Sequence, residues 1–314
     1  MSKKIVVALG GNALIKPGER PTVYTQFCNT RQALAPIAGL ICKGHRIVMT
    51  HGNGPQVGNI LIRSERSAGY AYELPLGVCV AQSQGEMGYM ISQEMKNSLR
   101  RCKAKDRNVV AMVTQVLVDP DDPAMSNPTK PVGPFFDSDR AEELKKEGVA
   151  VTEDAGRGFR RVVPSPIPYR ILESDSVKRL YEQGLVVIAV GGGGCPVYMR
   201  DNEVIDGVDA VIDKDLASKV LALEIGAEVL VISTAVEHVY LNFNKPGQKA
   251  VNRATVTEMK QWLREGHFAA GSMKPKIQAA VEFLEGGGEE VIITTPELVE
   301  KAVDGDAGTH IVRQ

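Results

Sequence analysis

Hydrophobic and polar positions follow two alternating patterns along this chain. Short apolar runs rich in Val and Ile, typical of buried parallel strands, recur at 5–9, 46–50, 109–113, 185–190, 228–232 and 290–294. Between them, apolar residues fall at helical spacing in 26–43, 82–101, 174–183, 215–223 and 276–284. Strand and helix therefore alternate, which predicts an α/β sheet covered by helices on both faces.

One segment interrupts this alternation. Residues 117–170 are rich in Pro, Gly, Asp and Arg, and within them only a short charged helix, about 140–147, is expected. Loops of this length are uncommon in compact domains unless they form a lid or a projecting unit. The pattern predicts a flap inserted into one elaborated domain.

Composition and charge narrow the class of protein. The chain is 43% hydrophobic and 24% charged, as expected of a globular protein, and its net charge of -1 argues against a nucleic-acid partner. We expect no membrane span and no signal peptide, and hence a cytoplasmic protein. The five cysteines are scattered and odd in number, which favours reduced thiols that pack as small core residues.

Glycine-rich turns follow several of the predicted strands, at 10–11, 52–54, 191–194 and 271–272. Glycine lets the backbone wrap closely around an anion, and ligands of open α/β sheets bind beyond the carboxyl ends of the strands. Each turn alone is equally compatible with a structural role, but their repetition favours a phosphate site. The chain has neither a P-loop nor a complete dinucleotide-binding fingerprint, which disfavours a dehydrogenase.

Three lysines stand where they can meet an anion. Asp213 is a candidate N-cap, which places Lys214 in the first turn of a helix, where a cation opposes the helix dipole unless an anion binds. Lys276 follows Pro275, a residue suited to the first position of a helix. Lys130 lies between prolines in the flap. The alternatives are a surface ion pair for Lys214 and a solvated loop for Lys130.

Six stretches, taken together and in order, resemble the carbamate kinases of the amino-acid kinase superfamily. They are VALGGNAL (7–14), THGNGPQVG (50–58), NPTKPVGPF (127–135), AVGGGG (189–194), IDKD (212–215) and GSMKPK (271–276). The second and third are specific to carbamate kinases, whereas the glycines of the first mark only the wider superfamily.

The resemblance implies an architecture. It is a three-layer α/β/α sandwich with a mainly parallel eight-stranded central sheet, a projecting flap subdomain at about 117–170, and a homodimer. A carbamate-side lobe would span 1–207 and a nucleotide-side lobe 208–314.

The resemblance also implies an activity, reversible and Mg²⁺-dependent phosphoryl transfer between ATP and carbamate that gives ADP and carbamoyl phosphate. The expected role is ATP synthesis in arginine catabolism, through the arginine deiminase pathway. Alternatives are another enzyme of the superfamily, acting on an acylamino acid, an amino acid or UMP, and a catalytically silent nucleotide-binding regulator.

Site residues follow from the same resemblance. Lys214 and Lys276 would stabilise the transferring phosphoryl group, Asp215 would orient them, and Lys130 would swing in from the flap. The remaining candidates are phosphate-binding Gly10, Gly11, Asn12, Gly191 and Gly192, substrate-binding Gly52, Asn53 and Gly54, and nucleotide-binding Asp213, Val236, Tyr240 and Met273.

This chemistry suits the residues. Phosphoryl transfer depends mainly on position and on positive charge, and carbamate is already an anion that needs no general base. His51 is therefore expected to shape its loop rather than move a proton. Because Mg²⁺ commonly keeps waters and substrate phosphates as ligands, no dedicated protein cage for it is predicted.

Overall fold

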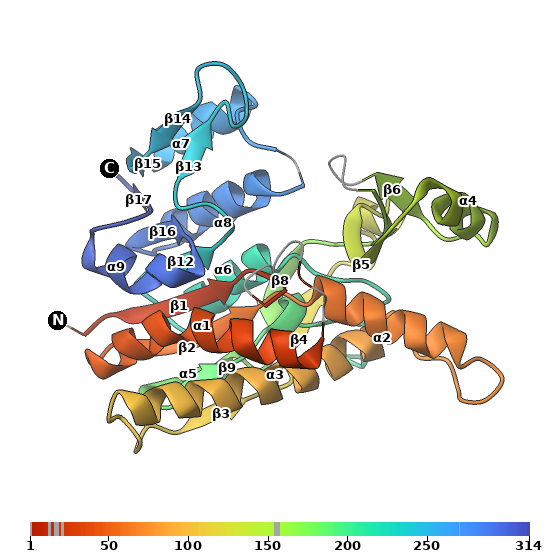
Figure 1. The fold of residues 1–314 in the computed structure, drawn as a ribbon, viewed down its shortest axis with the longest axis horizontal. Helices are drawn as coiled ribbons and strands as arrows, with labels where there is room; N and C mark the ends of the chain where they lie inside the picture. Colours follow the sequence, from red (N-terminus) through yellow and green to blue (C-terminus); the bar gives the residue numbers. More distant parts are fainter. Residues whose placement is uncertain (1, 12–13, 16–18, 20–21, 154–157, 270) are drawn as a thin grey trace.

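A central eight-stranded sheet organises the chain (Figure 1). The computed structural model describes residues 2–11, 14–15, 19, 22–153, 158–269 and 271–314. Across the sheet the strands lie in the order β15 (Arg253–Thr255), β17 (Thr309–Val312), β16 (Glu290–Thr294), β12 (Val229–Ser233), β1 (Lys4–Leu9), β2 (Arg46–His51), β9 (Val186–Ile188) and β3 (Val109–Ala111). Among the described residues, neighbouring strands of this sheet pair in parallel except β16 with β17.

Helices cover both faces of this sheet. Ile5, Val7 and Leu9 of β1 pack with α1 (Val23–Cys42), α3 (Leu76–Arg101) and α9 (Val299–Asp304). Val6, which points to the opposite face, packs with α5 (Ser174–Glu182), α6 (Lys214–Glu224) and α8 (Met273–Glu285). Successive side chains of a strand point to opposite faces, so a strand buried on both sides reads as a continuous apolar run. The predicted three-layer α/β/α sandwich is confirmed.

The flap projects to one side of the sandwich, next to α2 (Gly54–Arg66) (Figure 1). Its antiparallel sheet consists of β5 (Lys130–Phe136), β7 (Phe159–Val163) and β6 (Val151–Glu153), with α4 (Ser138–Lys146) beside them. At its base, a second small sheet joins β4 (Gln115–Val118) and β8 (Pro168–Ile171) to β10 (Cys195–Met199) and β11 (Ile205–Gly207). The predicted flap and its short helix are present, whereas its strands escaped prediction because prolines and charges interrupt them.

The C-terminal part completes the molecule. A hairpin of β13 (Val239–Leu241) and β14 (Lys249–Val251) lies with α7 (Val256–Arg264) at the top of Figure 1. No helix within the described ranges combines the length and the apolar character that a membrane crossing requires.

Two of the five cysteines form a disulfide, contrary to the prediction that all of them are reduced thiols packed in the core. Cys42 and Cys102 form a disulfide, with their Cα atoms 6.6 Å apart, and both residues are exposed rather than packed in the core. They stand at the carboxyl ends of α1 and α3, two helices that pack side by side. The prediction of reduced core thiols was therefore wrong for this pair, because helix packing joins residues 60 positions apart. Cys79 and Cys195 are free and buried, as expected, and Cys28 is free and half-buried.

Candidate active site

The carboxyl ends of neighbouring parallel strands meet at one edge of the sheet. Leu9 lies opposite His51, Ala8 opposite Ile232, and Met49 opposite Ile188. The turns that follow β1, β2, β9 and β12 therefore begin side by side. This is the crevice where open α/β sheets bind ligands.

Two glycines allow these turns to approach one another closely. A Cβ on Gly192 would lie 2.1 Å from the side-chain nitrogen of Asn53, and Gly192 has a φ of +65°. A Cβ on Gly52 would lie 3.2 Å from the backbone nitrogen of Gly11 and 3.5 Å from Cδ of Lys214. A larger residue at Gly192 would displace the turn. The structure thus brings the turn after β2 against those after β1 and β9.

Buried polar side chains hold these turns in place. Asn53 donates a hydrogen bond of 2.8 Å to Ser83 of α3. Gln84, the next residue of α3, accepts from the backbone N–H of Thr114 at 2.9 Å, and the Thr114 hydroxyl accepts from the N–H of Val190 at 2.8 Å. Val190 has a φ of +52°, an unfavourable value for a β-branched residue that such a network can enforce.

The supporting residues Ser83, Gln84 and Thr114 were missed in the sequence. Both α3 residues are buried polar positions, at 0% and 4% exposure, on a helix whose other buried positions are mostly apolar. Polar residues on the apolar face of the predicted helix at 82–101 are a signal that could have identified Ser83 and Gln84.

A cluster of charges begins at the start of α6. As predicted, Asp213 caps this helix, since its carboxylate accepts from the N–H groups of Asp215 at 2.9 Å and Leu216 at 3.3 Å. Lys214 follows in the first turn, and its ammonium pairs with the Asp215 carboxylate. Lys276 donates to the other oxygen of that carboxylate at 2.7 Å. One buried carboxylate therefore holds two ammonium groups.

Lys276 enters the cluster from α8. This helix begins at Met273, so Pro275 is its third residue rather than its first. The expected position of Pro275 was wrong by two residues, but Lys276 still lies near the helix start. The surface ion pair considered for Lys214 does not describe it, since Lys214 is only 8% exposed.

Burial and opposite charge act against each other in this cluster. Burial alone would raise the pKa of Asp215, but the charges of Lys214 and Lys276 and their hydrogen bonds outweigh it and hold that pKa far below its usual range. Burial, together with the charge of Lys276, lowers the pKa of Lys214. Burial also opposes the charge of Lys276, yet Asp215 and Asp213 together raise its pKa.

The flap supplies the third lysine. Lys130, the first residue of β5, pairs with Asp213 at 2.5 Å. Burial would raise the pKa of Asp213, but the Lys130 charge beside it leaves that pKa below its ordinary value. Lys130, Lys214 and Lys276 then face two carboxylates, so the cluster carries one excess positive charge beside the N-terminus of α6. Both features favour a bound anion.

Three of the predicted nucleotide-binding residues lie outside this cluster, whereas Asp213, the fourth, belongs to it. Val236 is in the turn between β12 and β13, Tyr240 is in β13 with its ring 5.8 Å from that of Phe243, and Met273 begins α8. Asn12, predicted to bind phosphate, lies outside the described residues. In the described part of the chain, no group of three or more His, Cys, Asp or Glu residues is arranged to hold a metal ion.

Comparison with known proteins places this chain in a family. The sequence model of the amino acid kinase family matches residues 3–295. The chain belongs to the amino acid kinase family. It is 46% identical to a carbamate kinase of Pyrococcus furiosus, over 99% of this chain and 100% of that one. It is also 46% identical to a carbamate kinase-like protein of Escherichia coli, over the full length of both.

Solved structures of carbamate kinases are similar to this chain as well. The structure of a carbamate kinase from Giardia lamblia bound to citric acid superposes with a TM-score of 0.94 at 42% identity, covering 99% of this chain and 98% of that chain. A structure of the Giardia enzyme bound to AMP-PNP superposes with a TM-score of 0.89 at 43% identity, with the same coverage. The predictions of this family, of its fold and of an enzyme of the kinase class are confirmed.

We expect His51 to make the stability of this protein depend on pH. Its ring is fully buried, its Nδ1–H donates to the Gly52 carbonyl at 3.1 Å, and burial lowers its pKa from 6.5 to about 4. The unfolded chain binds a proton at higher pH than the folded one, so stability is complete above pH 6.5 and is lost as the pH falls toward 4. We expect the free energy of unfolding to fall by about 2 kcal/mol between pH 7 and pH 5 on this account.

Urea unfolding at the two pH values measures this loss. A His51→Gln variant, which has no titrating ring, should lose correspondingly less stability over the same interval. Equal losses in the two proteins would show that His51 is not the group responsible.

Proposed function

We propose that this chain catalyses reversible phosphoryl transfer between ATP and carbamate, giving ADP and carbamoyl phosphate. The observation that carries the proposal is the cluster of Lys130, Lys214 and Lys276 around Asp213 and Asp215. Full-length similarity to carbamate kinases supports the substrate, and the AMP-PNP complex of the Giardia enzyme supports the nucleotide.

The proposed reaction is a single in-line displacement. A carbamate oxygen forms a bond to the γ-phosphorus as the bond from that phosphorus to the bridging β,γ-oxygen breaks, and ADP leaves with the electron pair. Negative charge spreads over the equatorial oxygens of the moving group. In this proposal Lys214 and Lys276 stabilise this charge, and Asp215, which pairs with both, directs their ammonium groups. No proton has to be removed from the nucleophile, in keeping with a His51 that stays neutral at pH 7.

The turns have separate parts in this proposal. Gly10, Gly11 and Asn12 hold phosphate oxygens together with Gly191 and Gly192, whereas Gly52, Asn53 and Gly54 line the carbamate end. Val236, Tyr240 and Met273 contact the nucleotide base, and Asp213 lies on the nucleotide side. The lobe at 1–207 binds carbamate, and the lobe at 208–314 binds the nucleotide.

We also propose that Mg²⁺ binds together with the nucleotide. The carboxylates of Asp213 and Asp215 are both engaged by lysines, so they are poor candidates for a protein cage. Mg²⁺ bound to nucleotide phosphates and water would neutralise charge on the phosphates. The homodimer, the cytoplasmic location and ATP synthesis in the arginine deiminase pathway rest on the similarity to carbamate kinases.

The direct test is ATP formation by the purified protein from ADP, Mg²⁺ and carbamoyl phosphate. We expect rapid ATP formation, and a loss of at least about a hundredfold in Lys214→Ala, since a positioned cation at the transferring group is removed. Lys145→Ala is the matched control, because this flap lysine pairs with Glu142 at the exposed surface. A folded protein that forms no ATP would contradict the proposal and call for a panel of acylamino acids, amino acids and UMP.

A further inference from the structure

The flap touches the body of the protein through two facing glycines. A Cβ on Gly58 of α2 would lie 2.0 Å from Cα of Gly133 in β5, a distance that no packing allows. Gly133 has a φ of +76°, a conformation that favours glycine. Backbone therefore meets backbone here, and no side chain larger than hydrogen fits at Gly58.

Apolar packing surrounds this contact. Val132, which precedes Gly133, is fully buried and lies in one cluster with Val57, Ile60 and Leu61 of α2. We call the contact between Gly58 and Gly133, with Val132 beside it, the glycine seat. Van der Waals contact of this kind is lost steeply when surfaces separate by even an ångström.

The glycine seat is three residues from the catalytic cluster. Lys130 begins the strand that continues through Val132 to Gly133, and its ammonium reaches Asp213 at 2.5 Å. Because Lys130 and Gly133 belong to the same strand, a shift of the seat would move Lys130 with it. The position of β5 on α2 would then decide whether Lys130 reaches the start of α6.

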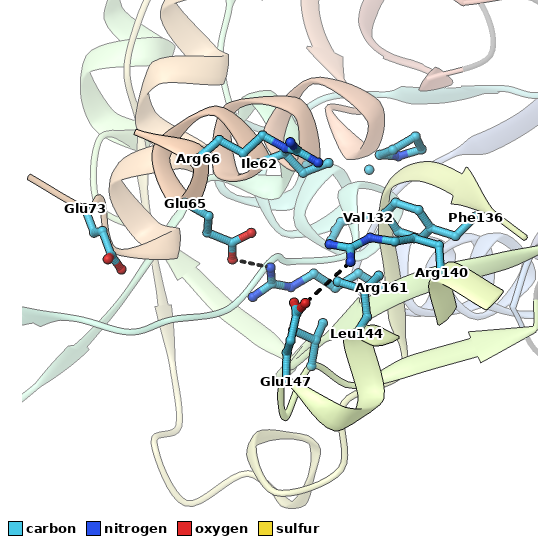
Figure 2. A pocket seen from close by; sticks show the side chains of 14 residues that line it. Ile62, Glu65, Arg66, Glu73, Val132, Phe136, Arg140, Leu144, Glu147 and Arg161 are labelled. Carbon is cyan, nitrogen blue, oxygen red and sulfur yellow. Dashed lines mark hydrogen bonds and ion pairs between the residues drawn. The ribbon is translucent and has the colours of Figure 1, made fainter. Parts of the chain in front are cut away.

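Beside the seat, the flap and α2 are separated by open space, and Gly58, Val132 and Gly133 lie at its border. A cavity of about 560 Å³ lies between α2 and the flap, with a wall that includes Ile62, Leu144 and Phe136 (Figure 2). An ion pair between Glu65 of α2 and Arg161 of β7 spans it (Figure 2). Glu65 is 44% exposed, and exposed pairs add little to stability. The glycine seat, where backbone meets backbone, is therefore a tight contact of this joint.

We propose that Gly58 is a positioning residue, which acts through Gly133 to hold Lys130 against Asp213. The effect on turnover rests on the proposed function, whereas the effect on the position of Lys130 does not. Gly58 has no side chain that could act on a substrate. Its part is to let β5 lie directly on α2.

The test is a Gly58→Ala variant, examined first without substrate. Amine acetylation, read by mass spectrometry, gives the reaction rate of Lys130 relative to Lys145 of the same flap. Lys130 is 28% exposed and ion-paired, so its release from Asp213 should raise this ratio several-fold. Gly85→Ala is the matched control, because Gly85 lies in α3 and its Cβ would meet nothing within 4 Å. Its ratio should equal that of the parent protein.

The turnover of the Gly58→Ala variant is the second measurement. We expect Gly58→Ala to lower turnover about a hundredfold, as a small misplacement of a reacting group does. The double variant Gly58→Ala/Lys130→Ala should be no slower than Lys130→Ala alone, since both changes remove the same interaction. Effects that multiply in the double variant would overturn the proposal.

A second variant covers the case in which Gly58→Ala fails to fold. Glu65→Arg sets two like charges against each other at the exposed edge of the joint, and we expect the same rise in the acetylation ratio, smaller in size. An unchanged ratio in folded variants overturns the glycine seat whatever the substrate is. A raised ratio in a protein whose parent transfers no phosphoryl group would sustain the seat and contradict the proposed function instead.

Discussion

Lys276→Ala is expected to lower turnover by about a thousandfold, the upper range for loss of one preorganised donor to a developing negative charge. Its ammonium is held at 2.7 Å from Asp215, and the two carboxylates around it raise its pKa despite burial, so it stays charged throughout the working pH range. A charge fixed in advance needs no reorganisation when the phosphoryl group moves. Steady-state kinetics of ATP formation from carbamoyl phosphate and ADP measures the loss.

The same helix offers a matched control for this substitution. Lys274 lies two residues earlier in α8 and is exposed, so Lys274→Ala should retain nearly full turnover. Lys276→Ala should fold, because Asp215 keeps its ion pair with Lys214. Near-normal turnover in a folded Lys276→Ala protein would contradict the assigned role, and equal losses in both variants would point to a general effect of the helix.

The main fold could be predicted because the strands in the middle of the sheet are buried on both faces. β1, β2, β12 and β16 are continuous apolar runs, and the structure places them within a residue or so of their expected bounds. The edge strand β15 and its neighbour β17 contain only three and four residues, with Arg, Thr and His among them. Such short polar segments become strands only when a neighbour supplies their hydrogen bonds, which no local pattern reveals.

The site was predictable in part for the same reason. The helix start at Asp213 and Lys214 is a local signal, and the structure has both residues as expected. Lys130 lies 83 residues before its partner Asp213, and the pairing depends on how the flap docks on α2. The same holds for Gly58 and Gly133, whose facing backbones come from two distant segments. Spacing along the chain carries no information on such contacts, whereas resemblance to a family supplies some of them.

Asp215→Asn is expected to cost both stability and activity. The carboxylate is 2% exposed and is shared by the ammonium groups of Lys214 and Lys276. Its removal leaves two like charges without their common counterion, and breaking a buried ion pair in this way destabilises proteins by about 3 to 5 kcal/mol. The lysines also lose the group that directs them, so turnover should fall by orders of magnitude. Urea unfolding at pH 7 measures the first effect.

The pH dependence separates this explanation from a simple packing defect. In the variant the folded-state pKa of Lys214, which burial already lowers, should fall further because Asp215 no longer opposes burial. The unfolded chain then binds more protons than the folded one up to about pH 10, so the stability of the variant should rise between pH 7 and pH 10 more steeply than that of the parent. A packing defect would instead lower the stability of the variant by the same amount at every pH, and its curve would run parallel to that of the parent.

Asp213→Asn is the matched control for charge removal at this helix start. Asparagine caps helices about as well as aspartate, and the pair of Asp213 with Lys130 is more exposed than the Asp215 cluster. We therefore expect a loss of stability well below that of Asp215→Asn. If the two variants lose the same stability, or if Asp215→Asn is as stable as the parent at pH 7, then Asp215 is not the carboxylate on which the two buried lysines depend.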